Sequence, residues 1–457
     1  MKIQTNGRVR LFLAAVFAVV AAVAAGPVAA VAGPGASWPQ FGHDAQLTGA
    51  NPAEKVINRG TVGGLTNEYV AFGPVSDTSG SISQSSPAVV GGVAYVGTNG
   101  GLLLALPATG CGSDQCQPLW TAQLSNGAFT TPAVANGLVF ISSAGSVENG
   151  IGTLYAFRAA GCGQPACRPV WTAPVPNVGS SPTVSGGVLY IVASDGRLLA
   201  FTAAGCGRVT CAPLWTGNLK SSAEAAPAVA NGLVYATSSD RLIAFRAGGC
   251  GLRTCPPVWA SVPVAGSDTG SGLIQGVGPT VSGDKVYFAS VDFASPDGKT
   301  STIYAYSSAA CAGTTNLNCT PLWVAHPADF DSIQANLTVA DGFLYGSAVG
   351  FVFAFDANGC GQPVCGFLWF GGLGFSSGTS AAPSIAGGVV YYTQNTGLIG
   401  GFDAGGCGEL ACSPLWSTLT QPFGGFMTTP AIVNGRLYVA GPAVGGMPTM
   451  WVYHLAE

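Results

Sequence analysis

The chain has 457 residues, of which only 8% are charged and 68 are glycine, and its formal net charge is −4. A slightly acidic chain has no basic patch with which to displace the counterions of nucleic acid, so nucleic-acid binding is excluded as a function. The shortage of charged residues excludes a mainly helical protein, and the abundant glycine favours many short strands joined by tight turns.

The first segment combines a basic start, an apolar run and a stretch of small residues. Three basic residues precede the apolar run 11–25, and the stretch of small residues ends in Ala30-Val-Ala32. This order is typical of a secretory signal peptide, so we expect a signal over 1–32 and one mature domain over 33–457. The apolar run is shorter than the ~20 residues of a spanning helix, with an uncleaved anchor as the alternative. We therefore expect a secreted or cell-surface monomer with no membrane span after cleavage.

A unit of about 49 residues recurs along the rest of the chain, as in repeat architectures, and its first part is a hairpin. Each copy has a proline, a short apolar strand, a tight turn and a second strand that ends in an aromatic residue. Turns such as Asn136-Gly137 favour hairpins because both central residues adopt positive φ. Leu337 replaces the proline in one copy. The heads of the units, spread over 87–430, are Pro87–Tyr95, Pro132–Phe140, Pro182–Tyr190, Pro227–Tyr235, Pro279–Tyr287, Leu337–Tyr345, Pro383–Tyr391 and Pro430–Tyr438.

Each hairpin is followed by a third strand, such as Leu102–Leu106, and in seven copies by two cysteines and a tryptophan that leads into a fourth strand. The tryptophans share one position of the repeat, which indicates packing between blades rather than stacking on a cofactor. These tryptophans are Trp120, Trp171, Trp215, Trp259, Trp323, Trp369 and Trp416. The cysteine pairs are Cys111/Cys116, Cys162/Cys167, Cys206/Cys211, Cys250/Cys255, Cys311/Cys319, Cys360/Cys365 and Cys407/Cys412.

Three roles are open to the cysteine pairs. A zinc site needs four ligands, and the chain has only three histidines to add to each pair. A redox role favours a Cys-x-x-Cys spacing and one special pair instead of seven equivalent ones. In an exported protein the paired spacing favours a disulfide within each loop, worth roughly 2 kcal/mol on the chain-entropy model. We therefore predict seven local disulfides and no metal site.

Eight units of four strands predict an all-β fold, an eight-bladed β-propeller of four-stranded antiparallel blades. Seven cysteine and tryptophan signals accompany eight hairpins, so the last blade has only three strands before Glu457. The segment Leu65–Phe72, which precedes the first unit, has the pattern of a single strand. We predict that this N-terminal strand completes the last blade and closes the ring, which removes an exposed sheet edge.

Blade six contains Ala354-Phe-Asp356-Ala-Asn-Gly359, followed by Trp369, and the mature chain opens with Trp38-Pro-Gln-Phe41. The first motif resembles the blade signature, and the second the start, of the pyrroloquinoline-quinone (PQQ) repeat propellers. That family includes quinoprotein alcohol dehydrogenases and a scaffold lipoprotein of outer-membrane protein assembly. The resemblance covers 38–457, but the signature aspartate survives only at Asp356 and Asp403, and the turn that follows is lengthened by the cysteines.

The resemblance implies either an enzyme or a scaffold. In the enzymes PQQ lies between a tryptophan floor and a disulfide of adjacent cysteines, with Ca²⁺ held by a carboxylate and an amide. The sequence has no Cys-Cys dipeptide, no tryptophan spared from packing, and no nucleophile-elbow, phosphate-loop or metallopeptidase motif. We therefore predict a non-catalytic binding scaffold with no catalytic residue, cofactor or metal. The alternative is a PQQ-dependent alcohol or sugar dehydrogenase with an altered site, which would use PQQ and Ca²⁺.

Candidate binding residues are few. His326, Asp329 and Asp331 could hold a cation but read better as a solvated loop, and Asp292 and Asp297 read as turn residues. Glu224 is the clearest carboxylate near a blade head. The partner is expected to be a protein or a small-molecule or glycan ligand. Exposed aromatic platforms for a sugar would be Phe330 and Phe426, and the insertions at 288–302 and 326–334 are the loops best placed for a partner.

The two residues before each head should face the central channel, and they are small and nearly uncharged. Enzymatic propellers usually line this channel with charged and aromatic groups, so small uncharged residues here argue against a catalytic site. The pairs are Ser85-Ser86, Thr130-Thr131, Ser180-Ser181, Ala225-Ala226, Val277-Gly278, Ala335-Asn336, Ala381-Ala382 and Thr428-Thr429.

Overall fold

The structure is a computed structural model, and it describes most of the chain after residue 36. The described residues are 1, 37–73, 85–128, 130–145, 150–176, 179–222, 224–264, 272–273, 277–292, 300–313, 317–327, 333, 335–348, 350–374, 381–420, 428–444 and 447–456. The chain divides into two compact units, Met1–Val31 and Ala32–Glu457, and every described strand belongs to the second. The signal segment expected over 1–32 lies outside the described residues except for Met1. Among the helices that the structure describes, none has the length and apolar character of a membrane span.

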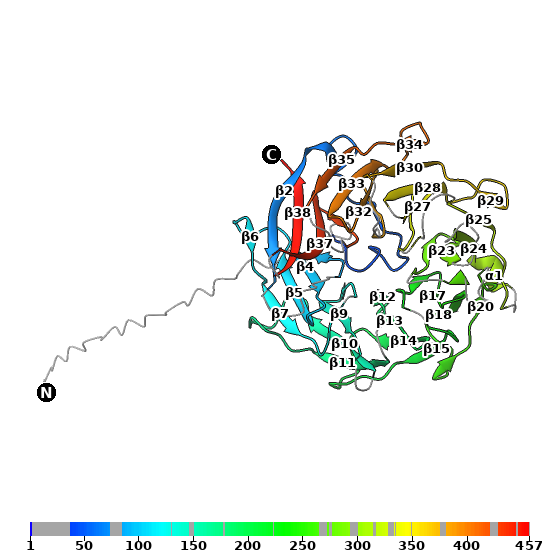
Figure 1. Ribbon diagram of the computed structural model, residues 1–457. Helices are drawn as coiled ribbons and strands as arrows, with labels where there is room; N and C mark the ends of the chain where they lie inside the picture. The colour runs from blue at the N-terminus through cyan, green and yellow to red at the C-terminus, as the bar shows by residue number, and fades with distance from the viewer. Residues whose placement is uncertain are drawn as a thin grey trace. The chain divides into compact units, whose positions relative to one another are not determined.

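Within the described residues the strands of the second unit form eight antiparallel sheets, the blades of a propeller (Figure 1), which confirms the predicted fold class. Each blade has a three-residue inner strand, two longer strands and an outer strand. Blade one contains β3 (Ala88–Val90), β4 (Val93–Gly97), β5 (Leu102–Pro107) and β7 (Trp120–Gln123), and blade two contains β8 (Ala133–Ala135), β9 (Leu138–Ser143), β10 (Ile151–Arg158) and β11 (Trp171–Pro176). Blade three contains β12 (Thr183–Ser185), β13 (Val188–Ala193), β14 (Arg197–Thr202) and β15 (Trp215–Asn218), and blade four contains β16 (Ala228–Ala230), β17 (Leu233–Thr237), β18 (Leu242–Arg246) and β20 (Trp259–Ala260).

The second half of the ring repeats this order. Blade five contains β22 (Thr280–Ser282), β23 (Lys285–Asp292), β24 (Thr300–Ser307) and β25 (Trp323–Ala325), with β21 (Gly272–Leu273) beside β23 and the short helix α1 (Ser308–Ala312) after β24. Blade six contains β26 (Thr338–Ala340), β27 (Phe343–Ala348), β28 (Phe351–Asp356) and β30 (Trp369–Gly372). Blade seven contains β31 (Ser384–Ala386), β32 (Val389–Thr393), β33 (Leu398–Asp403) and β35 (Trp416–Leu419). Blade eight contains β36 (Ala431–Val433), β37 (Arg436–Val444), β38 (Met447–Leu455) and β2 (Leu65–Phe72).

The inner hairpins form where the turn residues allow positive φ. Asn136 and Gly137 have φ of 51° and 75°, and Asn231, Asp341 and Asn434 occupy the same left-handed position in their blades. A type I′ turn of this kind matches the right-handed twist of the two strands that it joins. The predicted hairpin turns are therefore confirmed.

The ring closes through the N-terminal strand, as predicted. Strand β2 runs antiparallel to β38, with Leu65 opposite Leu455 and Phe72 opposite Thr449. Figure 1 shows the blue β2 beside the red β38. Because β2 supplies the fourth strand of blade eight, strands from the two ends of the sequence share one sheet.

The hydrophobic core lies between the faces of neighbouring blades. Both faces of the middle strands are buried, for example throughout Leu102–Pro107 of β5. Residues 293–299 of the expected blade-five insertion, and 328–332 of the second insertion, lie outside the described residues. The strands that flank the first of these loops, β23 and β24, are eight residues long and stay paired as far as Asp292 and Thr300.

Candidate functional site

The centre of the ring contains the segment 38–51, which we call the hub segment. It meets the inner strand of each blade in chain order, with one residue or two per blade. At least one hydrogen bond to each of the eight described inner strands measures 2.6–2.9 Å. These bonds join Trp38 to Val89, Pro39 to Val134, Gln40 to Val184, Ala45 to Val229, Gln46 to Val281, Thr48 to Val339, Gly49 to Ile385 and Asn51 to Ile432.

The chemistry of these contacts is mostly that of the backbone. Carbonyl oxygens of the hub segment accept from the amide of the central residue of the inner strand in blades one, two and four to seven. In blade three the side chain of Gln40, which is only 5% exposed, accepts from the amide of Val184. In blade eight the side-chain amide of Asn51 donates to Ile432. The inner strands would otherwise expose unpaired amides toward the channel, and such groups are costly when they are buried.

The residues before each blade head form a second, mostly buried ring. Several of them bond across blade boundaries: the amide of Thr131 donates to Ser181 Oγ at 2.9 Å, and the amide of Thr429 donates to Ser86 Oγ at 3.0 Å. The amide of Gly278 donates to Asn336 Oδ1 at 2.8 Å. The small polar side chains that the sequence places at the channel therefore bond to neighbouring blades.

A PQQ site of the kind that the resemblance implies requires a free tryptophan ring that faces a disulfide of adjacent cysteines. Trp38 pairs through its backbone with Val89 and meets His43 edge to face at 5.0 Å, and Trp451 is buried in blade eight. The seven disulfides join residues five or eight positions apart. The described residues at the centre of the ring therefore do not fit such a site.

A hollow of about 610 Å³ lies between the hub segment and the hairpin turns of blades six and seven. Asp44, Thr48, Lys55, Asn58 and Asp341 line it, together with apolar side chains that include Ile385. Asp44 is fixed there, because its carboxylate accepts from the amide of Thr48 at 3.0 Å. Hollows of this volume accommodate small molecules in other proteins.

All fourteen cysteines form the seven disulfides that the spacing predicts, each within one loop. So many disulfides indicate an oxidising environment outside the cytoplasm. Each loop also reaches the preceding blade, which the sequence analysis did not foresee. The second cysteine and the residue before it pair in parallel with the outer strand of that blade, so we call each such loop a clasp.

The clasps share one geometry. The amide of Thr121 in β7 donates to Pro165 of the next clasp at 2.8 Å, and the amide of Cys167 donates back to Thr121 at 2.8 Å. Four clasps contain short strands: β6 (Gln115–Cys116) on β2, β19 (Thr254–Cys255) on β15, β29 (Val364–Cys365) on β25 and β34 (Ala411–Cys412) on β30. The other three clasps form the bridges Thr121–Ala166, Thr172–Thr210 and Ser261–Cys319.

Six of the repeat tryptophans are at most 5% exposed, and Trp416 is half-buried. Five of the six lie under the clasp of the next blade, whereas no described clasp pairs with β35, the strand that carries Trp416. A Cβ atom added to Gly161, the residue before Cys162, would lie 2.7 Å from the ring of Trp120. The same close approach joins Gly205 to Trp171, Gly249 to Trp215, Gly359 to Trp323 and Gly406 to Trp369.

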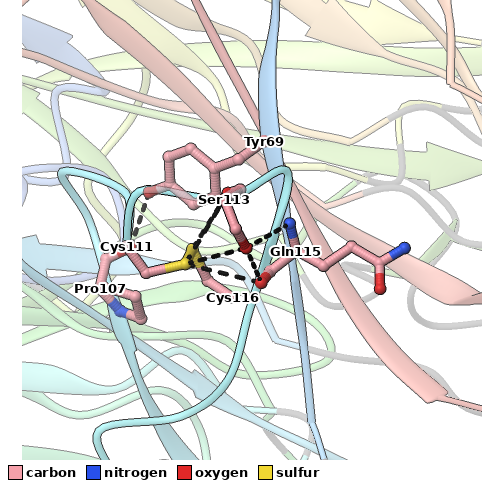
Figure 2. The surroundings of a disulfide bond; sticks show 6 residues. All are labelled: Tyr69, Pro107, Cys111, Ser113, Gln115 and Cys116. Carbon is pink, nitrogen blue, oxygen red and sulfur yellow. Dashed lines mark hydrogen bonds between the residues drawn. A yellow bond between two sulfur atoms is a disulfide. The ribbon is translucent and has the colours of Figure 1, made fainter.

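Tyr69 is a packing residue that the sequence analysis missed. In β2 it occupies the place of the repeat tryptophan, and a Cβ atom at Gly110 would meet its ring at 3.6 Å. Its hydroxyl donates to the carbonyl of Pro107 at 2.6 Å, beside the Cys111–Cys116 loop in Figure 2. The sequence signal for this role was an aromatic residue, Tyr69, within the predicted closing strand.

The remaining candidate residues are not brought together. Glu224 is exposed, and His326 is exposed with its ring 3.1 Å from Thr302 Oγ1. Asp329, Asp331, Asp297, Phe330 and Phe426 lie outside the described residues, as does the side chain of Asp292. In the part of the chain that the structure describes, no three His, Cys, Asp or Glu side chains are grouped to hold a metal.

The family described as outer membrane protein assembly factor BamB matches residues 170–304. The search of curated protein sequences gave no match.

Solved structures with the same fold differ widely in what they do. BamB from Moraxella catarrhalis is 14% identical with a TM-score of 0.58, covering 85% of this chain and 99% of its own. The computationally designed protein Ika8 is 14% identical with a TM-score of 0.57, covering 85% and 100%. A europium-containing methanol dehydrogenase is 12% identical with a TM-score of 0.57, covering 92% and 98%. At these identities the likeness shows the fold alone.

Proposed function

We propose that this chain, a member of the PQQ-repeat β-propellers, is a non-catalytic scaffold that binds a partner protein after export from the cytoplasm. It acts as a monomer and needs no quinone and no metal. The disulfides support a secreted or cell-surface location, because such bonds persist in oxidising compartments. The expected signal segment supplies the route of export.

The filled hub is the observation that carries the proposal. In a propeller enzyme of the quinoprotein type, the centre of the ring must leave room for the cofactor and substrate. Here the hub segment bonds to all eight inner strands, and the residues before the blade heads bond to one another. Opening the channel would require breaking these hydrogen bonds, each worth about 0.5–1.5 kcal/mol. We therefore look for the partner's site outside the central channel.

Binding and activity assays separate the scaffold from the quinoprotein alternative. The exported protein is incubated with PQQ and Ca²⁺, and its melting temperature and dye-linked alcohol oxidation are measured. We expect no shift of the melting temperature and no oxidation. A ligand at 100 times its Kd would add about 2.7 kcal/mol of stability, so specific binding is readily detected. Saturable binding together with alcohol oxidation would overturn the proposal.

A further inference from the structure

The outer strand β35 of blade seven differs from the other outer strands that the structure describes, because no clasp covers its edge. The seven clasps pair with β7, β11, β15, β20, β25, β30 and β2. In the register of the blades, Ser417 lies opposite Gly400, as Thr121 lies opposite Leu104. Ser417 is exposed, and no described residue bonds to its outward amide.

Two further observations concern the boundary between blade seven and blade eight. Tyr95 and Tyr345 donate through their hydroxyls to carbonyls of the next blade, Ala159 and Ala404, whereas the buried hydroxyl of Tyr391 in blade seven has no partner among the described residues. Ile57, Val62 and Leu65 pack in the same core cluster as Tyr391 and fill the space with apolar side chains. These residues fill the core between blades seven and eight, but they do not pair with the backbone edge of β35.

We propose that the edge of β35 is a docking site for an extended segment of a partner protein, which adds to β35 as a parallel strand in the register of the clasps. This inference rests on the proposed scaffold function and names the surface that carries it. Seven other outer strands of the ring each pair with a clasp in parallel. The backbone of an outer strand in this fold can therefore accept a parallel strand along its edge. Strand addition to a sheet edge is a general mode of peptide recognition.

The clasps also define the chemistry of the segment. The second cysteine of the clasp is buried in most copies, for example Cys116 at 0% exposure and Cys412 at 9%. A small apolar residue of the partner therefore fits that position. Leu419 ends β35 and is 51% exposed, where β7 ends in Gln123 and β15 ends in Asn218. An apolar residue of the partner beside Leu419 would remove this side chain from water.

A second copy of the chain is a poorer occupant. The edge spans four residues, Trp416–Leu419, and two copies joined there would bury far less than the roughly 1,200–2,000 Å² of a stable interface. A partner that supplies a flexible segment needs only this edge and can make its other contacts elsewhere.

The test uses a clasp of the protein itself as the probe. A synthetic peptide with the sequence of residues 161–169, closed by its disulfide, is titrated into the intact protein up to about 5 mM, because an interaction of ~4 kcal/mol corresponds to a Kd of about 1 mM and fivefold protection needs about four times that concentration. Hydrogen exchange is followed at individual amides. We expect the amide of Ser417 to exchange at least about fivefold more slowly in a saturable manner, a change of ~1 kcal/mol. The amides of Thr121 and Thr172 should be unchanged.

Two controls make the result specific. In Ser417→Pro the outward donor is removed at an edge position where proline is tolerated, and the melting temperature verifies folding. The same peptide N-methylated at the position of Cys167 lacks the returning donor. Both should abolish the protection. The inference is overturned if the unmodified peptide does not slow exchange of the Ser417 amide. Because Ser417→Pro has no amide at that position, exchange in this variant is measured at Leu419, and protection there equal to that in the unchanged protein also overturns the inference. A dimer whose formation protects the Ser417 amide would overturn it as well. The PQQ assay tests the scaffold function separately.

Discussion

Two nitrogen atoms of the Arg436 guanidinium donate to the two carboxylate oxygens of Glu68, each at 2.6 Å. Arg436 belongs to β37 and Glu68 to the closing strand β2, so the ion pair spans the sheet in which the two ends of the sequence meet. The hydrogen bonds that Arg436 donates to Glu68 raise the pKa of Arg436 above its ordinary value. Because both side chains are largely covered, this pair should stabilise the closed ring more than a surface pair would.

The variant Glu68→Gln is expected to lower the free energy of unfolding by about 1–2 kcal/mol, because it leaves the covered Arg436 without its carboxylate. The matched control is Asp195→Asn, which removes a more exposed ion pair to Arg197 within one hairpin. That change should cost less than ~0.5 kcal/mol. Denaturant titrations of both variants check the prediction, and equal losses would contradict it.

The hub segment offers a comparison between two glutamines. In Gln40→Ala the amide of Val184 loses its acceptor, and we expect a loss of about 1–3 kcal/mol with faster hydrogen exchange at Val184. Gln46 accepts from Val281 through its backbone carbonyl and its side chain is exposed, so Gln46→Ala should change stability by less than ~0.5 kcal/mol. If the two variants are equally stable, the side chain of Gln40 does not hold blade three.

The clasps predict that loss of a disulfide is felt in the preceding blade. In the double variant Cys206→Ala and Cys211→Ala, we expect a loss of roughly 2 kcal/mol and faster exchange of the Thr172 amide, which the clasp covers. The amide of Thr216 lies under the next clasp and should keep its protection. Faster exchange confined to residues 203–213 would show that the disulfide is only a local fastener.

Two glycines of one clasp separate packing from backbone strain. Gly161 and Gly163 have φ of 79° and 74°, but only a Cβ atom at Gly161 would collide with Trp120, at 2.7 Å. Gly163→Ala should cost about 1–2 kcal/mol for its left-handed backbone. Gly161→Ala should cost about 1–3 kcal/mol more, because the tryptophan must move. Chemical denaturation measures both, and similar losses would mean that Trp120 moves without cost.

Buried tyrosines predict a loss of stability in alkali. Burial raises the pKa of Tyr95, Tyr190 and Tyr453 from 10.0 to about 12. Between these values the unfolded chain releases protons that the folded protein retains, so the contribution of these tyrosines to stability is full below pH 10 and is lost as the pH rises toward 12. Denaturant midpoints measured from pH 8 to 12 check this decline.

A single substitution tests the same effect at one residue. Tyr95→Phe should make the decline shallower, because one titrating group is removed, and Phe140 already occupies this place in blade two. An unchanged slope would contradict the assignment to Tyr95.

The fold was predictable because its signals are local. Turn pairs such as Asn136-Gly137 and the single register of the tryptophans mark each blade, and counting seven loops against eight hairpins located the closing strand Leu65–Phe72. The filled hub was not predictable, because residues such as Pro39 and Ala45 contribute carbonyl oxygens that every amino acid has. The reach of each clasp was hidden for the same reason, since its parallel pairing uses backbone groups. Gln40, Asn51 and Tyr69 contribute side chains that could have been noticed.

The hub segment and the closing strand impose an order on biosynthesis. Residues 38–72 are synthesised before any blade hairpin, yet their partners include Ile385, Ile432 and Leu455, which are made much later. The N-terminal part therefore has to wait, without its final hydrogen bonds, while all eight blade hairpins are synthesised, and folding is governed by contacts that are distant in sequence. A chain truncated before blade eight would lack β36, β37 and β38, so β2 and the side-chain amide of Asn51 would be left without their partners and the ring could not close.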